Sequence, residues 1–279
     1  MTVRQPPPLV WAGAVAFLSL GLLALAVAGG WLGADVDRGA NFCEAAAGTV
    51  RQPVNTLSNL GFVAVGLLVA RQAGRPGGLG TGTLAQRPGL ATAYACVVVL
   101  LGPASMAMHA TETELGGHLD MASMYLIAAF AVAYAAMRRW ERGPAFLAAL
   151  YLAVLVVCEL VALLGEVPWL GHAGNVAFGA GLASALWLES RVARGGRLVL
   201  DTRWAWAAAG SILVALAIWT TAKTGSALCF PTSLYQGHGV WHLLCALSAW
   251  CLFRLYVSER PVGEQARDLS EPAPARRPG

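Results

Sequence analysis

The sequence predicts an all-α protein that crosses a membrane several times. The chain has 279 residues, of which 57% are hydrophobic and only 12% are charged, and its mean hydropathy is +0.59. Several apolar stretches reach the roughly 20 residues that a helix needs to cross a bilayer. None alternates apolar and polar residues over strand-length segments, as a membrane β-barrel would. These observations favour a polytopic helical bundle.

Eight apolar runs are the predicted membrane helices. They cover residues 9–32, 54–71, 90–110, 118–137, 144–164, 172–189, 203–222 and 237–257. The first run contains Ala26-Val27-Ala28, which is similar to a signal-peptide cleavage site, but its apolar part exceeds the roughly 7–15 residues of a signal core. We therefore expect an uncleaved extra helix in residues 1–36, ahead of a seven-helix core in residues 37–257. Cleavage would leave that core unchanged.

The basic residues predict the orientation of the bundle. All Lys and Arg except Arg38, Arg51 and Lys223 fall on one side of the predicted membrane, together with both termini. Because Lys and Arg collect in cytoplasmic loops, we expect cytoplasmic termini. The Pro-rich segment 258–279 has the composition of a disordered tail. The net charge of +4 gives no indication of nucleic-acid binding, because the basic residues lie between the spans.

All five histidines fall at the outer ends of the predicted helices. His238 and His242, in GHGVWH, lie one helical turn apart, so they share a face and can bind one metal ion. His109, which ends the third helix, can supply a third ligand. Three histidines leave tetrahedral zinc one open position for water, which is typical of a catalytic site. We interpret His118 and His172 as amphipathic anchors at the membrane interface.

Two further polar residues lie near His109 in the sequence. Ser105 precedes it by four residues and shares its helix face, and Asp120 follows eleven residues later at the start of the next helix. A carboxylate beside apolar helices must face protein, water or a metal. Taken singly, Ser105 could bond a backbone carbonyl and Asp120 could cap its helix. Taken with the histidines, they form a candidate hydrolytic site.

The complete set of motifs resembles the alkaline ceramidase family, which belongs to a superfamily of seven-helix membrane hydrolases that includes the adiponectin receptors. The likeness rests on Ser-x3-His with Asp eleven residues later, on the late His-x3-His, and on the sequences NFCE (41–44), NTLSN (55–59) and QGHGVWH (236–242). The order and spacing of these motifs are specific, whereas each one alone is not. The resemblance implies a zinc-dependent hydrolase that cleaves the amide of ceramide into a sphingoid base and a fatty acid.

The resemblance also implies a role for each residue. His109, His238 and His242 would hold zinc, Asp120 would orient the attacking water and take its proton, and Ser105 would steady Asp120 or the developing oxyanion. These roles agree with elementary chemistry, since zinc lowers the pKa of bound water from 15.7 to about 7. Removing one oxyanion donor can cost roughly 10²–10³ in rate.

Family members with a calcium site build it around the segment that corresponds to NFCE. Here Glu44 is retained, but Asn41 stands where Asp is usual, Phe42 replaces Trp, Ala46 lacks a side-chain oxygen, and Gln52 replaces Glu. One carboxylate is few for a cation that takes 6–8 oxygen ligands. We therefore expect at most a weak calcium site at Glu44 and Asn41.

The six cysteines have no zinc-finger spacing. The resemblance implies a disulfide between Cys43 and Cys229, the alternative being two free thiols. The remaining cysteines fall in the predicted helices, where they can pack as small apolar residues. Glu159, inside the fifth helix, has two open interpretations: it lines a cavity, or it pairs with His172.

Three alternatives remain open at this point. The same site could act on other N-acyl or ester lipids, because nothing in the chain identifies a sphingoid head group and the Ala-, Gly- and Arg-rich composition suggests a bacterial inner membrane. The protein could instead be a receptor or hemolysin-like membrane protein in which zinc only braces the helices. A transporter is least favoured, since the ionisable groups cluster at one leaflet, where we expect the zinc site.

Overall fold

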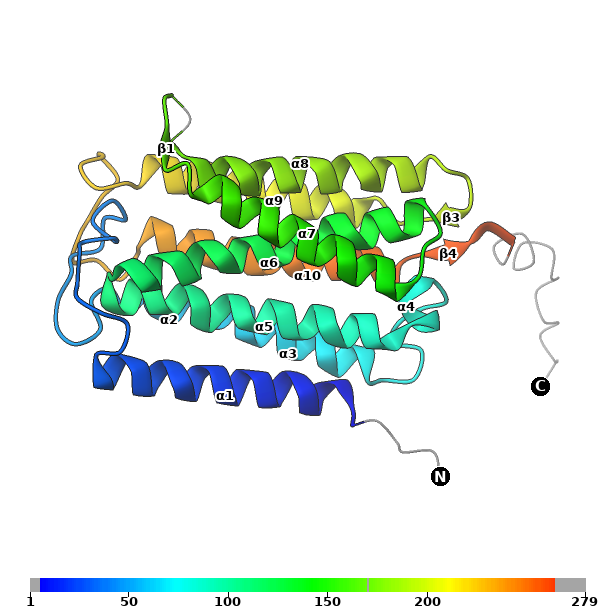
Figure 1. The fold of residues 1–279 in the computed structure, drawn as a ribbon, viewed down its shortest axis with the longest axis horizontal. Coiled ribbons are helices and arrows are strands. Elements are labelled where there is room, and N and C mark those ends of the chain that lie inside the picture. Colours follow the sequence, from blue (N-terminus) through cyan, green and yellow to red (C-terminus); the bar gives the residue numbers. More distant parts are fainter. Residues whose placement is uncertain (1–5, 170, 264–279) are drawn as a thin grey trace, which may run out of the picture.

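The computed structural model describes residues 6–169 and 171–263, which form one bundle of long helices (Figure 1). The helices are α1 (Pro8–Gly29), α2 (Pro53–Ser58), α3 (Leu60–Ala73), α4 (Thr83–Gln86), α5 (Pro88–Thr111), α6 (Glu114–Arg139), α7 (Pro144–Ala162), α8 (Ala173–Ala193), α9 (Arg203–Thr221) and α10 (Gly237–Val257). Two antiparallel pairs of two-residue strands complete it: β1 (Glu166–Val167) with β2 (Gly171–His172), and β3 (Leu198–Val199) with β4 (Arg260–Pro261).

Within the described residues, seven helical spans are long and apolar enough to cross a membrane, counting α2 and α3 as one. The eighth long helix, α8, is less apolar because Asn175 and Glu189 interrupt it, but it packs against α6 and α7 like its neighbours. The chain is therefore a multi-pass helical membrane protein. The predicted fold class, a seven-helix core preceded by an extra N-terminal helix, is confirmed.

Helix boundaries follow local signals in the sequence. Pro8, Pro53, Pro88 and Pro144 each stand in the first turn of a helix, where the missing N–H of proline costs nothing. The predicted single helix over 54–71 is wrong in one respect, because the chain breaks between α2 and α3 at Asn59. This break lies within NTLSN and orients two side chains toward α10, as described below.

The core lies around α5, which contacts α1, α3 and α6. Its centre contains the buried aromatic rings of Tyr94, Tyr134 and Tyr256. The Tyr94 hydroxyl donates a hydrogen bond to the Ala249 carbonyl of α10 at 2.6 Å, which satisfies a polar atom that lipid could not. Gly66 lets α3 approach α5 closely, since a Cβ there would meet Val99.

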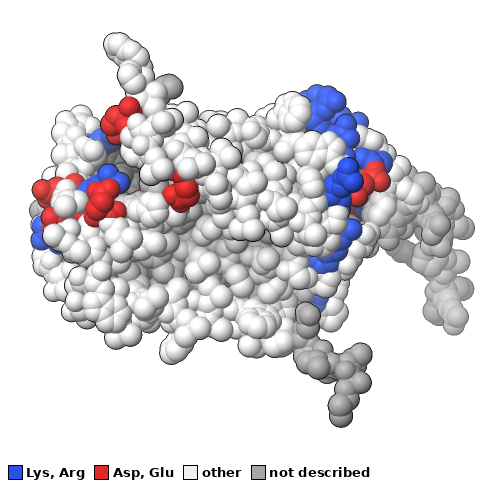
Figure 2. Space-filling view, in the orientation of Figure 1, with Lys and Arg blue, Asp and Glu red and all other residues white. Residues whose placement is uncertain are grey.

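The two ends of the bundle differ in charge. Arginines gather at the end where α1 begins and α10 ends, whereas acidic side chains gather at the other (Figure 2). Residues 258–263, which begin the predicted tail, pack against the bundle: Glu259 is fully buried, and β4 pairs with β3. The rest of that predicted tail, residues 264–279, lies outside the described residues.

Candidate metal centre

Three histidines from distant parts of the chain meet at the acidic end of the bundle. His109 comes from the last turn of α5, and His238 and His242 come from the first two turns of α10. All three are buried, and they offer ring nitrogens that lie within 4.8 Å of one another. His109 Nε2 and His238 Nε2 are 3.1 Å apart. Tetrahedral zinc with ordinary Zn–N bonds holds two nitrogens about 3.3 Å apart, so this spacing fits one ion.

Gln52 fixes the ring of His109. Its Oε1 lies 2.7 Å from His109 Nδ1, while its Nε2 donates to the carbonyls of Gly39 at 2.8 Å and Glu44 at 3.3 Å. Because the amide nitrogen is engaged by two carbonyls, the oxygen must accept the Nδ1 proton of His109. The lone pair of His109 Nε2 is then directed at the other histidines, as a metal ligand requires.

Ser58 fixes the ring of His242. The Ser58 hydroxyl donates to the Asn55 carbonyl at 2.8 Å, and its oxygen lies 2.7 Å from His242 Nδ1. With this hydroxyl orientation Ser58 Oγ can accept the Nδ1 proton, which leaves His242 Nε2 free for a metal. The amide nitrogen of Asn59, at the break between α2 and α3, lies 3.2 Å from the same ring nitrogen. The irregular backbone at NTLSN thus brings two polar side chains against α10.

His238 is held by packing instead. The ring of Phe42 stacks on it with centroids 4.0 Å apart, and Phe42 also meets His109 edge-on at 5.3 Å. Among the described residues, His238 Nδ1 has no hydrogen-bond partner. His109 Nε2, left unprotonated by Gln52, faces His238 Nε2 at 3.1 Å, a position that either a proton on His238 or a shared cation can fill. The three imidazoles therefore fit a shared metal ion.

A disulfide holds Phe42 in place. Cys43, the next residue, is bonded to Cys229 across a sequence separation of 186 residues, with Cα atoms 5.5 Å apart. The Cys43 amide also donates to Thr224 Oγ1 at 2.9 Å. These are the two cysteines that the family resemblance paired. The link fastens the loop before α2 to the loop before α10, on either side of the histidines.

Ser105 lies one helical turn before His109, and Asp120 lies beside Ser105. Ser105 Oγ is buried, bonds no backbone carbonyl among the described residues, and interacts with the Asp120 carboxylate. Asp120, from the antiparallel neighbour α6, is the acidic side chain beside it. Asp120 does not cap α6, because Thr113 does so by accepting from the Gly116 amide at 3.0 Å. The structure therefore agrees neither with Ser105 bonding a backbone carbonyl nor with Asp120 capping its helix.

The comparison with known protein families agrees with this geometry. A sequence model of the ceramidase family matches residues 38–268. The chain belongs to the ceramidase family. The match leaves out α1, in agreement with an extra N-terminal helix ahead of the family's core, and it supports a hydrolase that acts on amides of ceramide-like lipids. No curated protein matches the chain.

In this ceramidase-family protein, the two residues considered for calcium make contacts within the protein. Glu44 accepts from the backbone amides of Val54 at 2.7 Å and Asn55 at 2.8 Å, so its two carboxylate oxygens cap the first turn of α2. The Asn41 side chain is exposed, and its carbonyl accepts from the Thr224 amide at 3.2 Å. The role of Glu44 seen here is therefore to hold α2, which carries the partners of the histidines.

An acidic cluster close to this site was not predicted. Asp35, Asp37 and Glu112 place carboxylate oxygens within 4.8 Å of one another. Arg51 lies among them, with Nε 2.9 Å from Asp35 and 3.6 Å from Glu112. Burial raises the pKa of Glu112, and Asp35 adds to that shift while Arg51 opposes it. The Arg51 guanidinium thus offsets part of the negative charge of these three carboxylates. The cluster was not predicted because Glu112 is far from Asp35 and Asp37 in the sequence.

The other two histidines, His118 and His172, do not belong to the cluster of His109, His238 and His242. His118 is mostly exposed, and its Nε2 lies 3.6 Å from the Glu159 carboxylate. The pairing of Glu159 with His172 is therefore wrong. His172 instead accepts a hydrogen bond from the Gly174 amide at 3.1 Å and caps α8. Its ring thus has a structural role at a helix end, which the sequence did not indicate.

Proposed function

We propose that the protein is a zinc-dependent intramembrane amidase that cleaves ceramide-like N-acyl lipids to a sphingoid base and a fatty acid. The observation that carries this proposal is the convergence of His109, His238 and His242 beside Ser105 and Asp120 in a member of the ceramidase family. Three neutral imidazoles favour zinc over calcium or magnesium, which prefer oxygen ligands. Bound zinc would polarise the amide carbonyl and acidify a water molecule.

The chain's own residues have separate tasks in this proposal. Asp120 takes the proton of the attacking water and passes it to the nitrogen as the C–N bond breaks, so the amine leaves in neutral form. Ser105 donates a hydrogen bond to the developing oxyanion or to Asp120, and its hydroxyl has no other partner among the described residues. Gln52 and Ser58 keep His109 and His242 in the tautomers that leave Nε2 free.

The charge distribution supports an orientation for this chemistry. With the arginine-rich end in the cytoplasm, both termini are cytoplasmic and the histidines lie near the outer leaflet of a bacterial inner membrane. The family match from residue 38 supports residues 1–36 as a separate helix ahead of a catalytic core that begins near residue 37. The match continues to residue 268, and residues 258–263 pack against the bundle, so the core extends beyond residue 257.

Metal content tests the ligand set. The purified chain should carry about one zinc per molecule, and His238→Ala should lose it. The matched control is His118→Ala, because His118 lies at the same end of the bundle but outside the cluster. Equal zinc content in all three proteins, or none in the wild type, would overturn the assignment.

Activity tests the proton-transfer residue. Asp120→Asn should retain zinc but release no fatty acid from a ceramide in lipid nanodiscs, and a panel of other N-acyl lipids run in parallel identifies the substrate. A zinc-braced receptor would keep its metal and hydrolyse none of them. Turnover of Asp120→Asn at the wild-type rate would show that another group takes the proton.

A further inference from the structure

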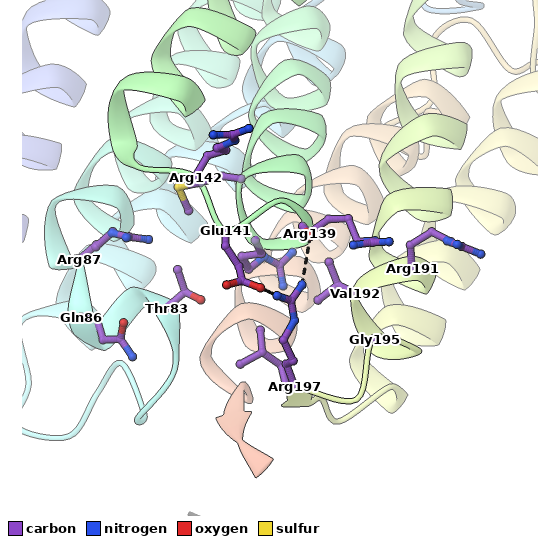
Figure 3. Close-up of a pocket in the computed structure, with 13 residues that line it drawn as sticks. Thr83, Gln86, Arg87, Arg139, Glu141, Arg142, Arg191, Val192, Gly195 and Arg197 are labelled. Atoms are coloured by element: carbon purple, nitrogen blue, oxygen red, sulfur yellow. Dashed lines mark hydrogen bonds and ion pairs between the residues drawn. The ribbon is translucent and has the colours of Figure 1, made fainter. Parts of the chain in front are cut away.

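A pocket lies at the opposite end of the bundle from the histidines. It has a volume of about 250 Å³ and is lined by residues from α4 and the position after it, from the end of α6, from the end of α8, and from the loops that follow α6 and α8 (Figure 3). Six arginines line it, with one carboxylate, Glu141: Arg87, Arg138, Arg139, Arg142, Arg191 and Arg197. Figure 3 shows Arg139 and Arg197 between Arg87 on one side and Arg191 on the other.

The floor of this arginine pocket is rigid. Arg138 is buried and forms ion pairs with Glu189 and, at 2.8 Å, with Glu259. Its guanidinium also lies over the ring of Tyr134, 4.3 Å from the centroid. Arg138 thus joins α6 to α8 and to the segment after α10, and it is held in place by these contacts.

The wall carries unbalanced positive charge. Arg197 pairs with Glu141 and donates to the carbonyl of Arg139 at 3.1 Å. The other four arginines of the wall form no ion pair with any described residue: Arg87, Arg139, Arg142 and Arg191. Even with Glu189 and Glu259 counted, six guanidinium groups face three carboxylates. The pocket therefore attracts anions.

We propose that this pocket binds the phosphate group of an anionic lipid head group. Guanidinium groups match the oxygens of phosphate in charge and geometry, and basic pockets between membrane helices at the cytoplasmic side are suited to such head groups. The volume is below the 300–1,000 Å³ of pockets for drug-sized molecules, so it fits a phosphate with a short substituent. Arginines that only orient the protein in the membrane would need neither a pocket nor a buried arginine held by ion pairs. The presence of both features therefore favours a binding site.

The test uses the purified full chain in nanodiscs of phosphatidylcholine. One arm replaces part of this lipid with phosphatidylglycerol, and a second adds soluble glycerol 3-phosphate to the neutral nanodiscs. Native mass spectrometry counts the lipid retained after transfer to detergent, and thermal unfolding reports stabilisation. The variant is Arg87→Gln with Arg139→Gln. The matched control is Arg71→Gln with Arg194→Gln, which removes the same charge from the same end of the bundle, outside the pocket lining.

We expect the wild type to retain one phosphatidylglycerol, the pocket variant to bind it at least about tenfold more weakly, and the control to bind like the wild type. Equal weakening in both double variants would overturn the proposal, because diffuse attraction to the arginine-rich end would then explain binding. Stabilisation by glycerol 3-phosphate without retention of lipid would overturn the lipid source. Unchanged binding in the pocket variant would overturn the site itself.

Discussion

Replacing Gln52 with leucine tests how the metal centre is held without touching a ligand. The substitution removes four side-chain hydrogen bonds: one from His109 Nδ1 at 2.7 Å, one from Asn55 Nδ2 at 3.3 Å, and one each to the carbonyls of Gly39 and Glu44. Loss of such an outer partner typically weakens metal binding 10–100-fold, which corresponds to about 1.4–2.8 kcal/mol. At about 1 kcal/mol for each hydrogen bond, the metal-free protein should also lose roughly 4 kcal/mol of stability.

Two measurements separate these effects. Competition with a chelating dye gives the zinc affinity of each purified variant, and thermal unfolding of the metal-free protein gives its stability. Gln52→Glu keeps an oxygen acceptor for His109 but loses the two donors, so it should bind zinc at least as well as the wild type while being destabilised. Gln72→Leu is a control, since Gln72 donates to the Gly78 carbonyl at the other end of the bundle.

Zinc affinity of the two Gln52 variants decides whether this hydrogen bond positions the metal ligand. If Gln52→Leu binds zinc as tightly as the wild type, the hydrogen bond to His109 does not position a metal ligand. If Gln52→Glu loses zinc as strongly as Gln52→Leu, then the two donors to the backbone, rather than the acceptor, hold the site.

Three further predictions concern the scaffold. Cys43→Ser with Cys229→Ser should cost about 2–5 kcal/mol, because the disulfide restricts a long segment of the unfolded chain; equal melting of oxidised and reduced wild type would contradict this. Arg138→Met should cost about 3–5 kcal/mol in thermal unfolding, since it leaves two buried carboxylates without their cation, and a smaller loss would mean that those carboxylates are protonated. Tyr94→Phe should cost about 1 kcal/mol by losing the hydrogen bond to the Ala249 carbonyl; a neutral effect would show that the carbonyl finds another donor.

The helices could be located from the amino-acid sequence, because a bilayer requires long apolar runs and the prolines mark where several of them begin. The sequence also indicated which residues to consider for the site. His238 and His242 share a helix face by spacing alone, and Ser105 with His109 does the same. Their joint order resembles the family to which the chain belongs.

The partners that surround those residues depend on tertiary packing and could not be predicted from the sequence. Gln52 meets His109 across 57 residues of sequence, and Ser58 meets His242 across 184. Glu44 caps α2, and Arg138 is fixed by carboxylates from two other segments. Such partners depend on how each helix is rotated about its axis and on where the backbone breaks. Hydrophobic periodicity constrains those rotations only loosely when most faces of a helix are apolar, so packing and the pairing of buried polar atoms make the final choice.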